Sequence, residues 1–222
     1  MKPEAYENDY KYEKTHWWYQ ARNRIVTELI RHDVGKSFGS ILDFGCGTGN
    51  LISKLSTLGD VTGCDKSNEA LEFCKKKGFR NIRHIKNDDL SEMGKYDLIT
   101  LLDVIEHVDD DVSLLKKLAD HLEPGGKIII TAPAYMFFWS GEDYVSEHKR
   151  RYVRKQLSEV VAAGGLKVVR ASYFNTFLFV PVLLSIKLKI ALNPESKKMS
   201  SIAPVPKFIN AVLRMIFTME LP

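Results

Sequence analysis

The sequence predicts an α/β fold with a doubly wound, mostly parallel sheet, because short apolar runs alternate with helical segments from about residue 20 to residue 175. Such alternation favours parallel strands joined by right-handed helical crossovers. The 222 residues are 45% hydrophobic and 27% charged, which suits one domain with a well-buried core. We therefore expect a single domain over 1–222.

The individual elements follow from spacing and from the residues that end them. Ile25, Val26 and Leu29 recur at helical spacing, and the run 96–104 has few charges, as expected for a strand covered on both faces. Glycines stand at the ends of several predicted helices, where they favour helix termination. Strands are predicted over 40–45, 60–65, 81–88, 96–104, 127–133 and 166–174. Helices are predicted over 21–32, 50–59, 68–78, 111–122 and 153–165.

Three glycines follow the first predicted strand, and an acid stands directly before them. Gly45, Gly47 and Gly49 allow a ligand to approach the backbone, but Asp43 would repel a phosphate. Asp65 ends the second strand, where a carboxylate accepts hydrogen bonds from ribose hydroxyls. A nucleoside with a cationic group fits this combination, and S-adenosylmethionine has both features and no phosphate.

The motifs resemble those of the class I S-adenosylmethionine-dependent methyltransferases, especially the small-molecule branch that includes the ubiquinone-biosynthesis O-methyltransferases. The similar stretches are "LDFGCGTG", "GCDKS", "IKNDDL", "LLDVIEHV" and "LEPGGKIIITAP", in the family's order within 38–175. The resemblance implies a Rossmann-like sheet and methylation of a small-molecule or lipid-like acceptor at oxygen. It implies S-adenosyl-L-methionine as cofactor, bound by Asp43, Gly45, Gly47, Gly49, Asp65, Asp88 and Asp103.

The resemblance also divides the chain into three parts. Residues 1–37, with "THWWYQAR", are expected to form a helical lid, 38–175 the cofactor-binding core, and 176–222 a helical extension. The family's seventh strand is not found, because "INAVLRMIFTMELP" has a helical pattern. The sixth predicted strand would then lack its usual neighbour.

Two histidines are the candidate catalytic residues, because a hydroxyl acceptor must lose a proton. His107 and His148 follow the fourth and fifth strands, and either imidazole could accept that proton near neutral pH. No metal site is expected, since the aspartates of "HVDDD" fit an N-terminal helix cap. Two alternatives are an NAD(P)-dependent oxidoreductase, which the glycine spacing and Asp43 disfavour, and a non-catalytic cofactor-binding protein.

Charge is divided unevenly along the chain, with a net −6 over 1–147 and +10 over 148–222. A basic run at 149–155 and lysines around the apolar segment 177–198 indicate either peripheral contact with a membrane or a buried cap over the acceptor pocket. The apolar segment is too short to span a bilayer. Without an apolar leader, the chain is expected to be cytoplasmic, with the inner membrane surface as a second location. No nucleic-acid partner is expected, and the sequence does not define the oligomeric state.

Overall fold

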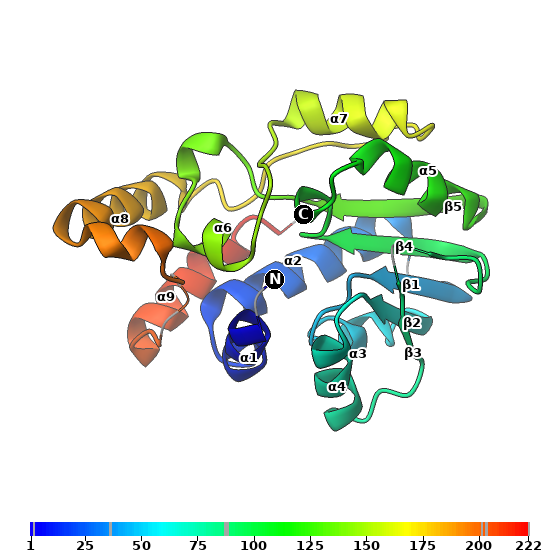
Figure 1. Cartoon of the computed structure of the whole chain (residues 1–222), viewed down its shortest axis with the longest axis horizontal. Helices are drawn as coiled ribbons and strands as arrows, with labels where there is room; N and C mark the ends of the chain where they lie inside the picture. The colour runs from blue at the N-terminus through cyan, green and yellow to red at the C-terminus, as the bar shows by residue number, and fades with distance from the viewer. Residues whose placement is uncertain (2, 36, 87–88, 201, 203, 222) are drawn as a thin grey trace.

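A parallel five-stranded sheet forms the centre of the structure, a computed structural model that describes residues 1, 3–35, 37–86, 89–200, 202 and 204–221 (Figure 1). The strand order is β3-β2-β1-β4-β5. The strands are β1 (Ser40–Phe44), β2 (Asp60–Asp65), β3 (Ile82–His84), β4 (Tyr96–Leu102) and β5 (Leu122–Thr131). Every pair of neighbours is parallel, so the predicted α/β class is confirmed.

Helices surround the sheet and extend beyond it. The α-helices are α1 (Pro3–Tyr12), α2 (Trp17–Leu29), α3 (Ile52–Leu55), α4 (Asn68–Lys76), α5 (Asp111–Asp120), α6 (Gly141–Val145), α7 (Arg154–Ala163), α8 (Phe179–Leu192) and α9 (Lys207–Thr218). Shorter helical turns are η1 (Ile30–Val34), η2 (Ile105–His107), η3 (Met136–Phe138) and η4 (Pro194–Lys198).

Alternate residues of the central strands face two separate cores. Ile41 and Leu98 pack with residues of α2 and α3 on one face. Leu42 and Ile99 pack with residues of α5 and α7 on the other. Because successive side chains of a strand point to opposite faces, both faces need apolar residues, which explains the continuous apolar runs in the sequence.

The carboxyl ends of β1 and β4 mark the point where the strand order reverses. Crossovers from β1 lead outward to β2, whereas β4 pairs on the opposite side of β1. In open α/β sheets, ligands bind in the crevice at this position. Helices α1 and α6 lie beyond these strand ends (Figure 1).

The predicted sixth strand is wrong. Residues 166–174 are all described and adopt no regular structure, and no named strand follows β5 in the described part of the chain. A strand needs a neighbour for its backbone hydrogen bonds, and in the described structure 166–174 pairs with none of the five strands. The fifth strand is longer than predicted: β5 starts at Leu122 and includes the Pro-Gly-Gly residues. Its pairing with β4 is irregular there, with a register shift between Tyr96 and Leu98.

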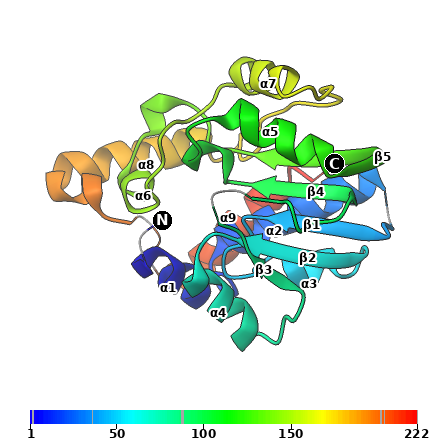
Figure 2. The ribbon, with the colours of Figure 1, turned by 45° about the vertical axis from the view of Figure 1, so that its right-hand side comes forward.

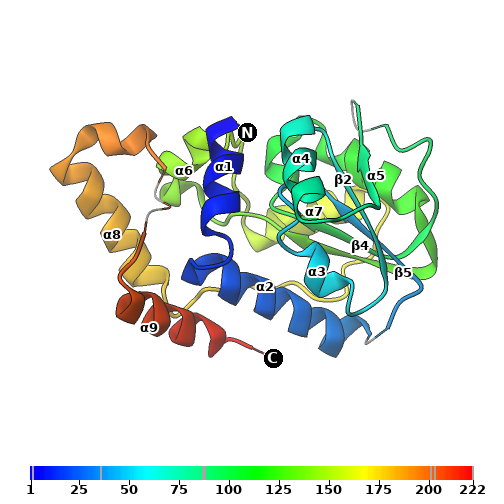
Figure 3. The ribbon, with the colours of Figure 1, turned by 90° about the horizontal axis from the view of Figure 1, so that it is seen from below.

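The two terminal parts of the chain pack on each other. Phe217 of α9 is fully buried and stacks on Trp18 at 5.3 Å between ring centroids, with Trp17 edge-on at 5.9 Å. Figure 3 shows α9 alongside the first half of α2. The helical extension therefore supports the helix that leads into the core.

Helix α8 projects away from the sheet (Figure 2). None of its residues is buried, so the alternative of a cap buried by the domain itself is wrong. Among the helices that the structure describes, none has the length and apolar character needed to cross a bilayer. The three cysteines are buried and form no disulfide in the described structure.

Candidate active site at the carboxyl ends of the strands

The glycine-rich turn after β1 adopts backbone conformations that favour glycine. Gly45, Gly47 and Gly49 have φ of 73°, 53° and 75°. A Cβ on Gly47 would meet no atom within 4 Å, so that side of the turn faces open space. The Gly47 N–H donates to Asp65 Oδ2 at 2.9 Å, which ties the turn to the end of β2. A ligand therefore has room against the Gly47 backbone.

Asp65 is placed as expected for a residue that binds ribose. Its carboxylate accepts the N–H groups of Gly47 and Ser67 on different oxygens, at 2.9 and 2.8 Å. Burial raises the pKa of this carboxyl, and the two backbone donors oppose the shift. A carboxylate has about four lone-pair sites, so acceptor capacity remains for two sugar hydroxyls.

Asp43 is buried at the end of β1, and no cationic side chain of the described residues forms an ion pair with it. Thr100 Oγ1 donates to Asp43 Oδ1 at 2.7 Å across the β1–β4 pair. Burial raises the pKa of Asp43 to about 6, although the Thr100 hydrogen bond and the Arg22 charge oppose the shift. A cation bound near Asp43 would favour its ionised form, which fits a sulfonium or ammonium group and not a phosphate.

Arg22 is a site residue that the sequence analysis assigned only to the lid. Its Nη2 lies 2.6 Å from Asp103 Oδ2 and donates to Thr131 Oγ1 at 3.2 Å. Thr131 in turn donates to Asp103 Oδ1 at 2.9 Å. The Nε of Arg22 is buried without a partner in the described structure, so a donor remains for an anionic group. In the sequence, the one sign of this role was that the charged Arg22 stands next to Ala21 and near Ile25, two apolar residues of the same helix.

The two candidate histidines lie together, with ring centroids 4.7 Å apart. His148 Nδ1 lies 2.9 Å from Asp143 Oδ1, and Asp143 also accepts two hydrogen bonds from Arg151. Burial alone would raise the pKa of Asp143, but the bonds from His148 and Arg151 lower it. His148 is therefore held by an ionised carboxylate, which leaves Nε2 for chemistry.

His107 and Glu106 complete this group at the end of β4. Burial and the neighbouring His148 lower the pKa of His107 to about 3, so its imidazole is neutral at pH 7. Glu106 is fully buried, and burial followed by the charge of Asp103 raises its pKa well above the usual range. Both Glu106 oxygens lack a hydrogen-bond partner within the described chain.

The "HVDDD" stretch behaves as expected, because Asp110 caps α5.

Helix α1 covers the side of the site near β2. Tyr10 stacks on Phe73 of α4 at 4.6 Å between centroids. Glu13 accepts from Thr48 Oγ1 at 2.7 Å and pairs with Lys77, which joins α1 to the glycine-rich turn. These contacts support the predicted lid. Asp88, the remaining predicted cofactor residue, lies outside the described residues.

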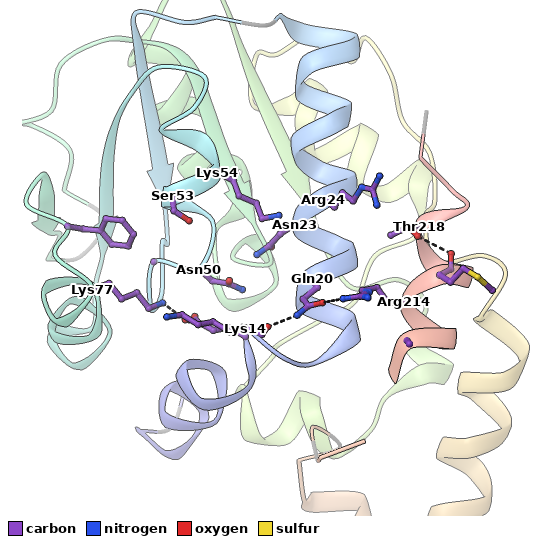
Figure 4. A pocket seen from close by; sticks show the side chains of 15 residues that line it. Lys14, Gln20, Asn23, Arg24, Asn50, Ser53, Lys54, Lys77, Arg214 and Thr218 are labelled. Atoms are coloured by element: carbon purple, nitrogen blue, oxygen red, sulfur yellow. Dashed lines mark hydrogen bonds and ion pairs between the residues drawn. The ribbon is translucent and has the colours of Figure 1, made fainter. Parts of the chain in front are cut away.

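A cavity of about 870 Å³ lies on the other side of these contacts (Figure 4). It lies between α2, the start of α3 and α9, and Figure 4 shows Lys54, Asn23 and Arg214 at its walls. Of the predicted site residues, it includes Gly49 alone. The cavity therefore meets the predicted site at the glycine-rich turn and includes none of the predicted acids.

The site and sheet together define a class of protein, the S-adenosylmethionine-dependent methyltransferases with a class I fold. There is open space beside Gly47, Asp65 lies at the end of β2, and Asp43 is a buried acid directly before the glycine turn. These three features fit S-adenosylmethionine. The sequence profile of a methyltransferase domain family ("Methyltransferase domain") matches residues 15–172. The chain belongs to this family. The predicted class is confirmed, and the oxidoreductase alternative is not favoured.

Curated relatives share part of their length with the chain. The ubiquinone biosynthesis O-methyltransferase of Aeromonas salmonicida is 27% identical over 168 residues, which cover 66% of this chain and 71% of the relative. The enzyme of the same name from Nitrosococcus oceani is 30% identical over 149 residues, 58% of this chain and 63% of the relative. In the match to the Shewanella pealeana enzyme, also 30% identical, the chain spans 50% of the relative.

Solved structures confirm the fold. A putative methyltransferase from Bacillus halodurans superposes with a TM-score of 0.57 at 14% identity and covers 77% of this chain and 81% of that one. An S-adenosylmethionine-dependent methyltransferase from Clostridium acetobutylicum gives 0.50 at 19% identity, covering 69% and 89%. Both share the Rossmann-like arrangement predicted from the motifs.

Proposed function

We propose that the chain transfers the methyl group of S-adenosylmethionine to a hydroxyl of a small or lipid-like acceptor. The observation that carries this proposal is the contact between His107 and His148, which brings together the loops that follow β4 and β5. Asp43, Asp65 and the backbone of Gly47 hold the cofactor. Arg22, with its unpartnered Nε, binds the cofactor's carboxylate.

Methyl transfer needs little covalent help from the protein. The acceptor oxygen forms a bond to the methyl carbon while the carbon–sulfur bond breaks, and the electron pair goes to sulfur, which becomes a neutral thioether. Holding the reactants in line contributes up to about 7–11 kcal/mol in ideal cases. An imidazole of the His107–His148 pair accepts the hydroxyl proton. The relatives' printed name, an O-methyltransferase, supports oxygen as the acceptor atom.

Replacement of His148 tests this assignment. His148→Ala should lower turnover on a hydroxyl acceptor by roughly 10²- to 10⁴-fold and leave affinity for S-adenosylhomocysteine nearly unchanged. His121→Ala is the matched control, because His121 is half-buried and its ring contacts the Gly94 carbonyl, before β4, rather than a predicted site residue. Full turnover in His148→Ala and in His107→Ala would remove both histidines from the reaction.

The apolar face of α8 supports a membrane-associated acceptor. Val180, Leu184, Leu188 and Leu192 recur at every fourth residue, and all four are exposed, between 58% and 79%. The lysines at 187, 189, 197 and 198 flank this face. An apolar helical face beside unpaired cations suits the interface of an anionic bilayer. We therefore propose peripheral membrane contact through 177–198.

Part of the basic run at 149–155 is already paired within the fold. Lys149 pairs with Asp109 at 2.5 Å, Arg150 with Asp111 at 3.1 Å, and Arg151 is bonded to the buried Asp143. Three of the five cations in the run are therefore matched within the fold, whereas Arg154 and Lys155 are exposed. Attraction of anionic headgroups by this run rests on Arg154 and Lys155, beside the lysines around α8.

Co-sedimentation with vesicles tests the membrane contact. The parent chain should bind vesicles of anionic phospholipid at low salt and release as salt screens the charges. Leu184→Asp should weaken this binding. Val169→Asp is the control, because Val169 is 81% exposed but lies outside α8. Equal binding of both variants, or no binding by the parent, would contradict the proposal.

A further inference from the structure

The cavity between α2, α3 and α9 has a positively charged wall that the proposed reaction does not use (Figure 4). Its volume of about 870 Å³ suits a small molecule, since such sites usually measure roughly 300–1,000 Å³. Glu13 is the one acid among the described residues that line it. The cations of the lining are Lys14, Arg24, Lys54, Lys77 and Arg214. The wall therefore carries an excess of positive charge.

Most of this charge has no carboxylate partner. Lys77 pairs with Glu13, which occupies the acid of the wall. Arg214 Nη1 donates to Gln20 Oε1 at 2.6 Å, and this acceptor is neutral. The cations of the wall that form no ion pair or side-chain hydrogen bond with a described residue are Lys14, Arg24 and Lys54. An anion from outside the chain could therefore contact several cations that the fold leaves unmatched.

Lys54 shows the effect of the unmatched charge. Burial lowers the pKa of its ammonium group, and the charges of Arg24 and Arg31 lower this pKa further, against the opposing charge of Glu28. Glu28 is itself paired with Arg31 at 2.7 Å. A bound anion would favour the charged form of Lys54, because an opposite charge nearby stabilises an ammonium group.

Asn23 is a second and independent sign of a ligand. This residue of α2 lines the cavity, is only 2% exposed, and its Oδ1 has no hydrogen-bond partner in the described structure. Figure 4 shows Asn23 and Lys54 of α3 pointing toward one another. Buried side-chain amides normally use both their donor and their acceptor atoms. The amide of Asn23 therefore has hydrogen-bonding capacity that a hydroxylated molecule in the cavity could use.

We propose that this cavity binds a small soluble molecule that carries a phosphate monoester and at least one hydroxyl group. At pH 7 a phosphate monoester has a charge of about −1.5 to −2 and three acceptor oxygens, which suits several cations without carboxylates. Arg24 and Lys54 contact the phosphate, and Asn23 contacts a hydroxyl. The site goes beyond methyl transfer, because the cavity includes none of the predicted acids or histidines.

A lipid headgroup such as that of phosphatidic acid has the same chemistry as a soluble phosphate monoester. The apolar face proposed to meet a membrane lies on α8, and no residue of α8 lines the cavity. A headgroup in the cavity would therefore have to reach it without the help of that face. This separation favours a soluble ligand.

Calorimetric titration of the full chain with glycerol 3-phosphate, in a buffer of low salt without phosphate, tests the site. The parent should bind one molecule, added salt should weaken the binding, and glycerol itself should not bind. Lys54→Gln should weaken the binding about 10-fold or more, the usual loss for a hydrogen bond to a charged group. Lys116→Gln is the matched control, because it removes the same charge at an exposed position of α5 outside the cavity.

Asn23→Asp keeps the shape of the side chain and adds a negative charge, so it should also weaken the binding about 10-fold or more. S-adenosylhomocysteine affinity equal to the parent's shows that each variant is folded, and either variant serves if the other is not. No saturable binding by the parent, or equal loss of affinity in Lys54→Gln and Lys116→Gln, would overturn the site.

Two competition measurements identify the occupant. Glycerol 3-phosphate should bind equally well with S-adenosylhomocysteine present, and displacement by it would place the phosphate in the cofactor site and overturn the proposal. Vesicles of phosphatidic acid should bind the parent and Lys54→Gln equally. Weaker vesicle binding by Lys54→Gln, with no binding of glycerol 3-phosphate, would assign the cavity to a lipid headgroup and overturn the soluble ligand. Methyl transfer is tested separately by His148→Ala and is left in place by each of these results.

Discussion

Lowering the pH from 7 to 5 should weaken binding of S-adenosylmethionine about tenfold through the buried carboxyl of Asp43. Burial raises the pKa of this group to about 6, so it is mostly ionised at pH 7 and mostly protonated at pH 5. A cationic ligand binds the ionised carboxylate better, so at low pH the free protein must release a proton before it binds the ligand. At one pH unit below the pKa, this release lowers the binding free energy by about 1.4 kcal/mol.

Calorimetric titrations at several pH values measure this effect. The cofactor's own α-amino and α-carboxyl groups titrate near 8 and below 4, outside the range. Asp9 in α1 also has a pKa raised by burial, to about 7, so only the part of the slope that Asp43→Asn removes counts. The amide still accepts from Thr100, which preserves the fold. An unchanged slope in Asp43→Asn, or a flat parent profile, would refute this reasoning.

Three other substitutions have defined outcomes. Asp65→Ala should weaken cofactor binding by about 1.5–3 kcal/mol for each lost charged hydrogen bond, and calorimetry showing parental affinity would exclude Asp65 as the ribose ligand. Gly47→Val should abolish binding while the chain stays folded by circular dichroism, because the side chain fills the open space beside the turn; retained binding would place the ligand elsewhere. Phe217→Ala should lower the free energy of unfolding by about 3–5 kcal/mol, whereas Phe208→Ala, at a position 79% exposed, should change it little; equal denaturation midpoints would mean that α9 does not support α2.

Local patterns predicted that three acids lie at the carboxyl ends of the strands, for a physical reason. Asp43, Asp65 and Asp103 each follow an apolar run, and the ends of parallel strands meet at one edge of a sheet whatever the loops do. The glycine turn is equally local, since its positive φ values require glycine. These features depend on residues close together in the chain.

Interactions across the fold could not be predicted in the same way. The Arg22–Asp103 pair joins a helix before the sheet to the end of β4, and the Asp143–His148 contact depends on how α6 turns back. The sixth strand failed because an apolar run forms a strand only beside a partner. The charge count of the 149–155 run could not show that Lys149, Arg150 and Arg151 are paired within the fold.

The most direct test of the central claim is calorimetric titration of the purified chain with S-adenosylhomocysteine and, separately, with NADH. The structure predicts saturable one-site binding of S-adenosylhomocysteine that Asp65→Ala weakens. It predicts no binding of NADH, because the buried carboxylate of Asp43 directly before the glycine turn would repel a pyrophosphate. Binding of NADH without S-adenosylhomocysteine, or equal binding by the parent and Asp65→Ala, would contradict the assignment of this site.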